Sequence, residues 1–171
     1  MKNVKSLSGL STLLLLFVLF GYTFSLAMAD SGGAGSFTLV VRGYTVTGEL
    51  QNAVLNPDGT ISMKMALDGS VPSPIGAVPI TANGVWTGVR NGSILSGTIG
   101  NVAGSVNPCF LFWCGAANFV GQGQWSGSLV SNSTVGSGGF QGTITFTSSD
   151  ISGVPVGQPE AISGSWNADF S

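Results

Sequence analysis

The chain of 171 residues contains 27 glycines and no histidine. Five Lys and Arg residues against seven Asp and Glu residues give a net charge of −2, so the chain lacks the basic surface that binds a nucleic-acid backbone. Without histidine it cannot form the Ser-His-Asp or Cys-His arrangements of common hydrolases, and its scattered acidic residues predict neither a catalytic carboxylate pair nor a metal site. We therefore expect a non-enzymatic protein that uses no cofactor and no metal and binds no nucleic acid.

The N-terminus has the layout of a secretory signal peptide. Two lysines precede the apolar run 13–20, and the small-x-small cleavage site Ala27-Met28-Ala29 follows. Residues 1–29 are therefore predicted to be removed, which leaves a secreted, cell-surface protein with no membrane span. The alternative is an uncleaved membrane anchor over residues 10–28.

After the signal, the sequence has the pattern of an all-β protein. Gly and Pro recur too often for a long helix, and no segment shows sustained helical periodicity of apolar residues. Residues 30–35 form a glycine-rich, flexible lead, and residues 36–171 are predicted to form a single all-β domain. Segment 71–79 contains three prolines and is expected to be a loop or an edge strand.

Short strands separated by turn residues fill this domain. The clearest hairpin has Asn56-Pro57-Asp58-Gly59 as its turn, because Pro and Gly stand at positions where turns favour them. We expect an antiparallel sandwich or jelly roll of about 8–10 short strands, with a small closed meander barrel as the alternative. The expected strands are 36–47, 49–55, 60–67, 85–90, 93–102, 124–130, 139–147 and 161–170.

A five-residue element recurs within these strands: an apolar residue, a polar residue, glycine, any residue and a second apolar residue. Its copies are 46–50, 95–99, 125–129, 140–144 and 162–166. Glycine inside a strand permits a sharp bend or leaves room for a bulky neighbour. We expect strongly coiled strands in which Trp86, Trp125 and Trp166 cover the glycines in the core. The alternative is a row of exposed tryptophans that stack on sugar rings.

Cys109 and Cys114 are the two cysteines of the chain, and in an exported protein they predict a disulfide. The alternative is a pair of free, buried thiols. Between them stand four large apolar residues: Phe110, Leu111, Phe112 and Trp113. These four side chains cannot all point to one side of a strand, and we expect some of them to form an interface with a partner, a membrane or a second subunit. The alternative is a buried plug that closes one end of the domain.

The N-terminal strand offers a mechanism of assembly. The flexible lead runs directly into an apolar strand in which Phe37, Leu39 and Val41 share one face. Such a strand can leave its own domain and complete the sheet of a neighbouring copy, with these three side chains filling pockets. The alternative is the first strand of the domain's own sheet.

Two triplets match the acceptor for N-glycosylation. They begin at Asn91 and Asn132, and both fall at predicted turns, where a bulky glycan is accommodated. The sequence therefore predicts two glycosylation sites, for use in a host that glycosylates exported proteins.

The signal peptide, the glycine-rich lead into an apolar strand and the Ser-, Thr- and Gly-rich, histidine-free β domain together resemble the secreted subunits of donor-strand filaments, in particular archaeal threads and bundling pili. The resemblance covers the layout of the mature chain and implies a jelly-roll-like sandwich with a polymerising role. We accordingly expect a cell-surface structural subunit that self-associates into filaments by N-terminal strand donation. The alternative is a monomeric secreted barrel that binds an apolar or carbohydrate ligand in a central cavity lined by Ile61, Met63 and the tryptophans.

Overall fold

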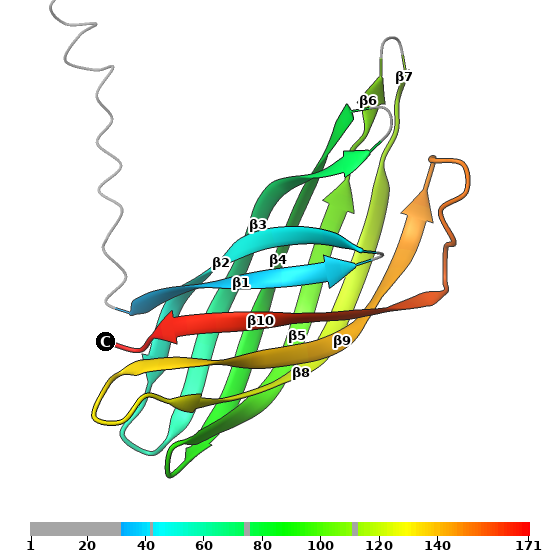
Figure 1. The fold of residues 1–171 in the computed structure, drawn as a ribbon. Helices are drawn as coiled ribbons and strands as arrows, with labels where there is room; N and C mark the ends of the chain where they lie inside the picture. The colour runs from blue at the N-terminus through cyan, green and yellow to red at the C-terminus, as the bar shows by residue number, and fades with distance from the viewer. Residues whose placement is uncertain (1–31, 42, 74–75, 111–112) are drawn as a thin grey trace, which may run out of the picture. The chain divides into compact units, whose positions relative to one another are not determined.

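The computed structural model describes residues 32–41, 43–73, 76–110 and 113–171, so the predicted signal peptide lies outside the described residues. The described part consists of ten strands (Figure 1). They are β1 (Gly33–Val41), β2 (Tyr44–Leu55), β3 (Thr60–Ser73), β4 (Gly76–Asn91), β5 (Ile94–Val106), β6 (Cys109–Phe110), β7 (Trp113–Cys114), β8 (Ala117–Leu129), β9 (Val135–Ser149) and β10 (Pro159–Asp169). No helix able to span a membrane occurs among these residues.

Eight of the strands close into a barrel in the order β1-β10-β9-β8-β5-β4-β3-β2. Every neighbouring pair is antiparallel, and β1 completes the ring because it pairs with β2 on one side and with β10 on the other. The all-β, antiparallel prediction is therefore confirmed. The architecture is the closed meander barrel given as the alternative, and the preferred sandwich or jelly roll is wrong, since two separate sheets would have edge strands, whereas each of the eight barrel strands pairs on both sides.

The two ends of the barrel differ. One end carries the turns after β2, β4 and β8 together with the C-terminus, and we call it the packed end (Figure 1). The other end carries the connections after β1, β3, β5 and β9, and we call it the mouth. The short hairpin of β6 and β7 extends from the mouth (Figure 1).

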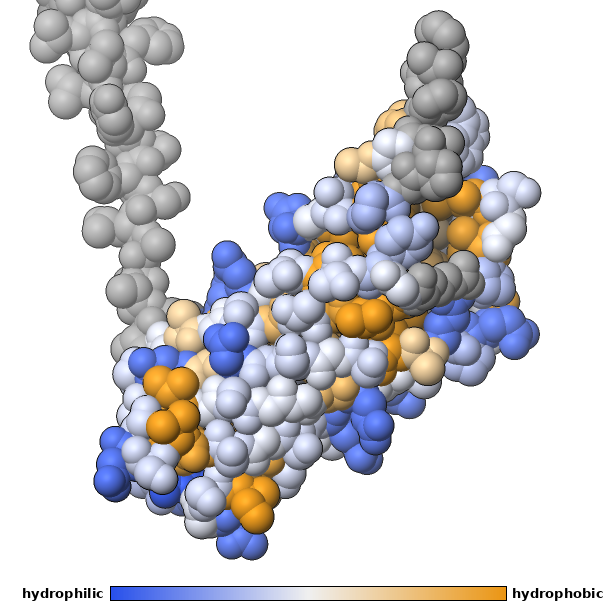
Figure 2. All heavy atoms as spheres, in the orientation of Figure 1, coloured by the Kyte–Doolittle hydropathy of each residue, from blue (hydrophilic) through white to orange (hydrophobic). Residues whose placement is uncertain are grey.

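Apolar side chains fill the interior, and Ser, Thr, Gln and Asn cover much of the outside. The strands alternate between buried and exposed positions, as period-2 strands around one core must. On the face seen in Figure 2 most of the surface is weakly polar, with apolar side chains near the mouth and at the packed end. The interior therefore carries the hydrophobic contribution to stability.

Aromatic rings at the packed end lie over the recurring glycines. Trp125 on β8 covers Gly97 on β5, where a Cβ atom would lie 2.7 Å from its Nε1. The same nitrogen donates a hydrogen bond to the carbonyl oxygen of Thr87 at 3.2 Å, beside Gly88, which pairs with Gly97. Because Gly88 and Gly97 have no side chains, the ring of Trp125 can lie against the backbone of two neighbouring strands.

The same arrangement is repeated two strands further on. Trp166 on β10 covers Gly127, and its Nε1 donates to the carbonyl oxygen of Ser126 at 3.1 Å. The expectation that tryptophans cover glycines in the core is thus confirmed for Trp125 and Trp166. Trp86 is fully buried at the centre, with Phe140 at 5.3 Å between ring centroids, and the row of sugar-binding tryptophans is not formed by these three residues.

The predicted turn at residues 56–59 is confirmed. Its Gly59 has a positive φ of 85°, and the Asp58 carboxylate accepts hydrogen bonds from the backbone N–H of Thr60 at 2.9 Å and from its hydroxyl at 2.7 Å. These two bonds stabilise the ionised carboxylate and lower the pKa of Asp58 below its ordinary value of 3.8.

This shift predicts a pH-dependent contribution to stability. Because the folded pKa is lower than the unfolded one, the contribution is present above about pH 3.8 and is lost as the pH falls through the folded pKa. The melting temperature of the wild-type protein should be higher than that of Asp58→Asn at pH 7, and the two melting temperatures should be equal near pH 2. A difference that persists unchanged at low pH would contradict the assignment.

Segment 71–79 belongs to strands and is not a loop within its described residues. Val71 pairs with Val78 and Pro72 with Ala77, in a part of β3 and β4 that extends beyond the pairing of β3 with β2. The proline at position 79 stands beyond the last pair of β4 with β5. Pro72 and Pro79 therefore stand where their strand pairs on one side only, in agreement with the edge-strand alternative.

Candidate ligand-binding pocket

The mouth of the barrel opens into an apolar hollow of about 490 Å³, which we call the bowl. All eight barrel strands contribute to it, because each begins or ends at the mouth. Its apolar lining includes Val71, Val78, Val106, Phe146 and Ile151. The bowl lies within the 300–1,000 Å³ range typical of sites for small molecules.

A second, smaller hollow of about 50 Å³ lies deeper in the barrel, and we call it the inner cavity. Its wall includes Met65, Leu67, Ala82, Trp86 and Val102. No polar atom of the described wall is exposed to it. The inner cavity is therefore an apolar space inside the core.

The two hollows share four apolar side chains, which we call the collar. They are Val41, Ile80, Phe119 and Ile144. Since these side chains line both spaces, the collar is the boundary between the bowl and the inner cavity. The barrel thus has an apolar interior that is filled at the packed end and hollow toward the mouth.

The size of the inward side chains differs between the two halves. Ala82 is a small inward-facing residue of β4 that lines the inner cavity, whereas Val102 and Met65 cover the next inward position, Gly84. Large tryptophan rings cover Gly97 and Gly127 at the packed end. An eight-stranded barrel is just wide enough to be filled by side chains or to hold one small ligand, and here each half takes one of these forms.

Polar groups are few in the pocket. Tyr44 and Glu160 are the polar side chains of the described lining of the bowl. Among the described residues no group of three or more His, Cys, Asp and Glu side chains could hold a metal ion. The chemistry that the pocket offers is therefore burial of an apolar surface, with orientation by a small number of polar groups.

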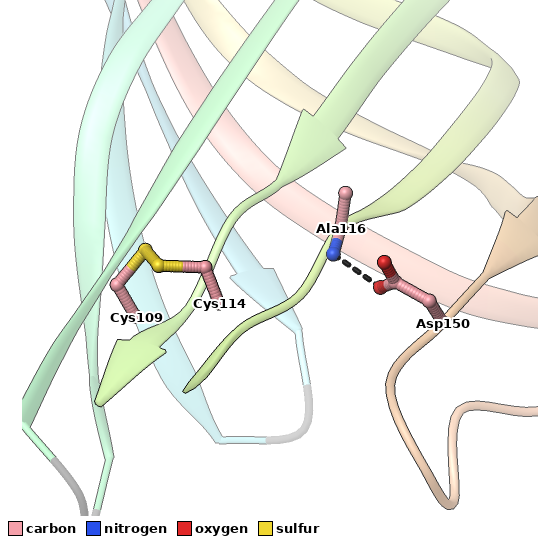
Figure 3. Close-up of a disulfide and its surroundings, with 4 residues drawn as sticks. All are labelled: Cys109, Cys114, Ala116 and Asp150. Atoms are coloured by element: carbon pink, nitrogen blue, oxygen red, sulfur yellow. Dashed lines mark hydrogen bonds between the residues drawn. A yellow bond between two sulfur atoms is a disulfide. The ribbon is translucent and has the colours of Figure 1, made fainter. Parts of the chain in front are cut away.

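Two of the loops at the rim of the bowl are linked to each other. Cys109 and Cys114 form the predicted disulfide, which closes the β6–β7 hairpin (Figure 3). Two residues beyond it, the backbone N–H of Ala116 donates to the carboxylate of Asp150 (Figure 3). The N–H of Asp150 donates in return to the carbonyl oxygen of Ala116 at 3.1 Å. This reciprocal pair ties the loop after β5 to the loop after β9.

Trp113 lies on the same rim. A Cβ atom at Gly115 would lie 2.6 Å from Cη2 of Trp113 and 2.9 Å from the side chain of Ile151, so the indole covers this glycine beside the lining of the bowl. Trp113 remains 46% exposed. It is the described member of the predicted interface in the disulfide loop, since Leu111, Phe112 and the side chain of Phe110 lie outside the described residues. A role in an interface stays a prediction.

The predicted interface residues of the N-terminal strand face the interior of their own barrel. Phe37 and Leu39 are buried in the core, and Val41 belongs to the collar. In this structure the strand has the role given as the alternative, the first strand of its own sheet. Strand donation to a second copy stays a prediction.

Both predicted glycosylation sites lie at the packed end, away from the bowl. Asn91 ends β4 and Asn132 lies in the turn between β8 and β9, and both side chains are exposed. Glycans at these positions would leave the mouth open. Their modification stays a prediction.

The expected position of a cavity is wrong. Ile61, Met63, Trp125 and Trp166 pack solidly, and Trp86 alone of the expected residues lines the inner cavity. The lining residues of the bowl were not identified from the sequence. Val78 stands between Ala77 and Pro79, and Val71 is followed by Pro72, so no alternation with polar residues marks these two valines in the sequence.

Comparisons with protein-family models, with curated proteins and with solved structures find no match to this chain. The pocket, its rim and the surface of the protein are therefore the features that indicate a function. Of these features, the bowl and the inner cavity are the hollows lined almost entirely by apolar side chains.

Proposed function

We propose that the protein is a secreted, non-enzymatic binding protein that holds an apolar small molecule in the bowl at the mouth of its barrel. The observation that carries this proposal is the apolar bowl, together with the apolar inner cavity that adjoins it across the collar. A ligand that leaves water for this space gains about 25 cal/mol for each Å² of apolar surface buried. The linked rim supplies a preorganised opening, which limits the entropy lost on binding.

A carbohydrate ligand is supported less well. The outer face of β5, β8, β9 and β10 has two shallow hollows lined by residues such as Thr98, Gln124 and Gln141. Sugar sites usually add an aromatic ring to such polar groups, but the rings of Trp125 and Phe140 beneath this face are buried in the core. We therefore place the ligand inside the barrel.

Self-association by strand donation is the second candidate. It is supported by the apolar face of β1, which would fill the same position in a second barrel. The predicted flexible lead gives less support, because its residues 33–35 belong to the paired strand β1. An exchange of this kind would have to open the ring at both neighbours of β1. The closed barrel gives a simpler account of a single chain, and we prefer the binding protein.

A charge in the bowl should abolish binding. Val78 on β4 lines the bowl, whereas Val85 on the same strand is 38% exposed on the outer face. The mature protein should bind an uncharged fluorescent dye such as N-phenyl-1-naphthylamine saturably and at one site. Val78→Asp should weaken this binding at least tenfold, because an unpaired carboxylate is unfavourable in an apolar site.

Val85→Asp is the matched control and should leave the dissociation constant within about twofold, since an exposed charge is already solvated. Circular dichroism of both variants must match that of wild type. Saturable binding that responds equally to both substitutions would place the ligand elsewhere. No binding of any uncharged apolar probe would overturn the proposal.

A further inference from the structure

We infer that the ligand is a single-chain aliphatic amphiphile that binds with its chain end first, with the terminal carbons in the inner cavity and the head group in the bowl. This inference rests on the proposed function and deepens it. It follows from the shape of the two hollows, from the chemistry of their walls and from the position of the few polar groups.

The narrowing of the space selects the shape of the ligand. A bowl of about 490 Å³ adjoins an inner cavity of about 50 Å³, and the collar side chains between them would have to move aside to admit a ligand. A flat polycyclic molecule fits the bowl but not the inner cavity. A single hydrocarbon chain is narrow enough to occupy both, since its end needs no more width than a methyl group.

The wall of the inner cavity selects hydrocarbon. A water molecule needs roughly 10–15 Å³ and two to four polar partners, and apolar cavities that lack such partners stay dry. The inner cavity is large enough, but no polar atom of its described wall is exposed to it. Trp86 Nε1 is buried in this region and has no hydrogen-bond partner in the described structure. Other atoms cover this nitrogen, so it offers no donor to the inner cavity. A polar chain end would therefore lose its hydration and gain nothing.

The bowl is where the head group finds polar neighbours. Tyr44, which is 41% exposed, and Glu160 are its polar lining side chains, and both stand on the side of the collar that faces the mouth. A head group placed there keeps access to water. The pocket is thus polar at the mouth and apolar inside, which matches an amphiphile bound with its head group at the mouth and its chain end inside.

The length of the chain should control affinity. For linear alcohols from 1-octanol to 1-tetradecanol, measured by displacement of the dye, each methylene should tighten binding about fourfold until the inner cavity is full. Ala82→Leu fills part of this cavity from its wall, so the series should stop improving at a chain two or three carbons shorter. Ala103→Leu makes the same change on the outer face of neighbouring β5, beside Asn83, and should leave the series unchanged.

A second measurement tests the position of the chain end without the Ala82→Leu variant, in case that variant does not fold. An alcohol brominated at its terminal carbon should quench tryptophan fluorescence in wild type and much less in Trp86→Phe, because Trp86 lines the inner cavity. The same alcohol brominated next to its hydroxyl should not show this dependence on Trp86. An alcohol with a second hydroxyl at its far end should bind at least tenfold more weakly.

The outcomes separate this inference from the proposed function. Dye and alcohols that bind without dependence on chain length, or a far-end hydroxyl that strengthens binding, would overturn the chain-end-first inference and leave the apolar binding protein standing. No binding of dye or of any alcohol would overturn both. A length series that Ala82→Leu shortens and Ala103→Leu does not would support both.

Discussion

Gly97→Ala is expected to destabilise the barrel by more than about 4 kcal/mol, which is exceptional for a single substitution. A Cβ atom at Gly97 would lie 2.6 Å from Cα of Gly88 and 2.7 Å from Nε1 of Trp125, and closer still to the carbonyl oxygen of Thr87. Two of these neighbours are backbone atoms held in the pairing of β4 with β5, so they cannot move aside. Because small domains are stable by only about 5–15 kcal/mol, this loss would remove a large share of the free energy of unfolding.

Gly100→Ala is the matched control on the same strand. No atom lies within 4 Å of the position that its Cβ would take, so the change in stability should stay within about 0.5 kcal/mol. Urea denaturation followed by circular dichroism measures both variants. A Gly97→Ala protein that unfolds at the same urea concentration as Gly100→Ala would show that the ring of Trp125 does not depend on this glycine.

Removal of residues 30–41 should destroy the cooperative fold. The deletion takes away β1 with Phe37 and Leu39, both buried, and leaves unpaired edges on β2 and β10. Open edges with apolar side chains beside them promote aggregation. We expect the shortened chain to lose its cooperative thermal transition and to leave the monomer position on a sizing column.

The same pair of proteins separates a closed barrel from strand donation. A barrel closed by its own β1 predicts that the mature chain elutes as a monomer at every concentration. Strand donation predicts a ladder of oligomers that grows with concentration. A shortened chain that remains a folded monomer with an unchanged spectrum would contradict both the closure by β1 and its donation.

Local patterns in the sequence predicted the parts of this fold that local chemistry determines. The turn at Asp58 and Gly59 followed from turn preferences, and the disulfide followed from two cysteines in an exported chain. The recurring glycines predicted covered gaps, and Trp125 and Trp166 cover two of them. Each of these features depends on a few neighbouring residues and on rules that hold in many folds.

Closure could not be predicted in this way. It depends on the pairing of β1 with β10, for example of Phe37 with Trp166, which stand at opposite ends of the domain sequence. Alternation identifies the inward face of each strand but not its partner, so a sandwich and a barrel have the same pattern. Several short strands with Gly-rich turns are typical of both architectures, and the jelly-roll-like sandwich is what the resemblance to donor-strand subunits implies.

The pocket could not be located from the sequence for a related reason. A cavity is the space that side chains leave, and it depends on which half of the barrel the large rings fill. Trp125 and Trp166 fill the packed end, whereas the small side chain of Ala82 lines the inner cavity. This difference appears only when the register of all eight strands is known.

The most direct test of the apolar pocket is a methyl NMR titration of the mature protein with a linear alcohol. The account predicts that methyl signals of Val78, Val106 and Ile144 shift saturably, while those of Leu50 and Leu95 in the packed half stay in place. Shifts confined to outward methyl groups such as those of Val85, or no saturable shift in the bowl, would contradict it.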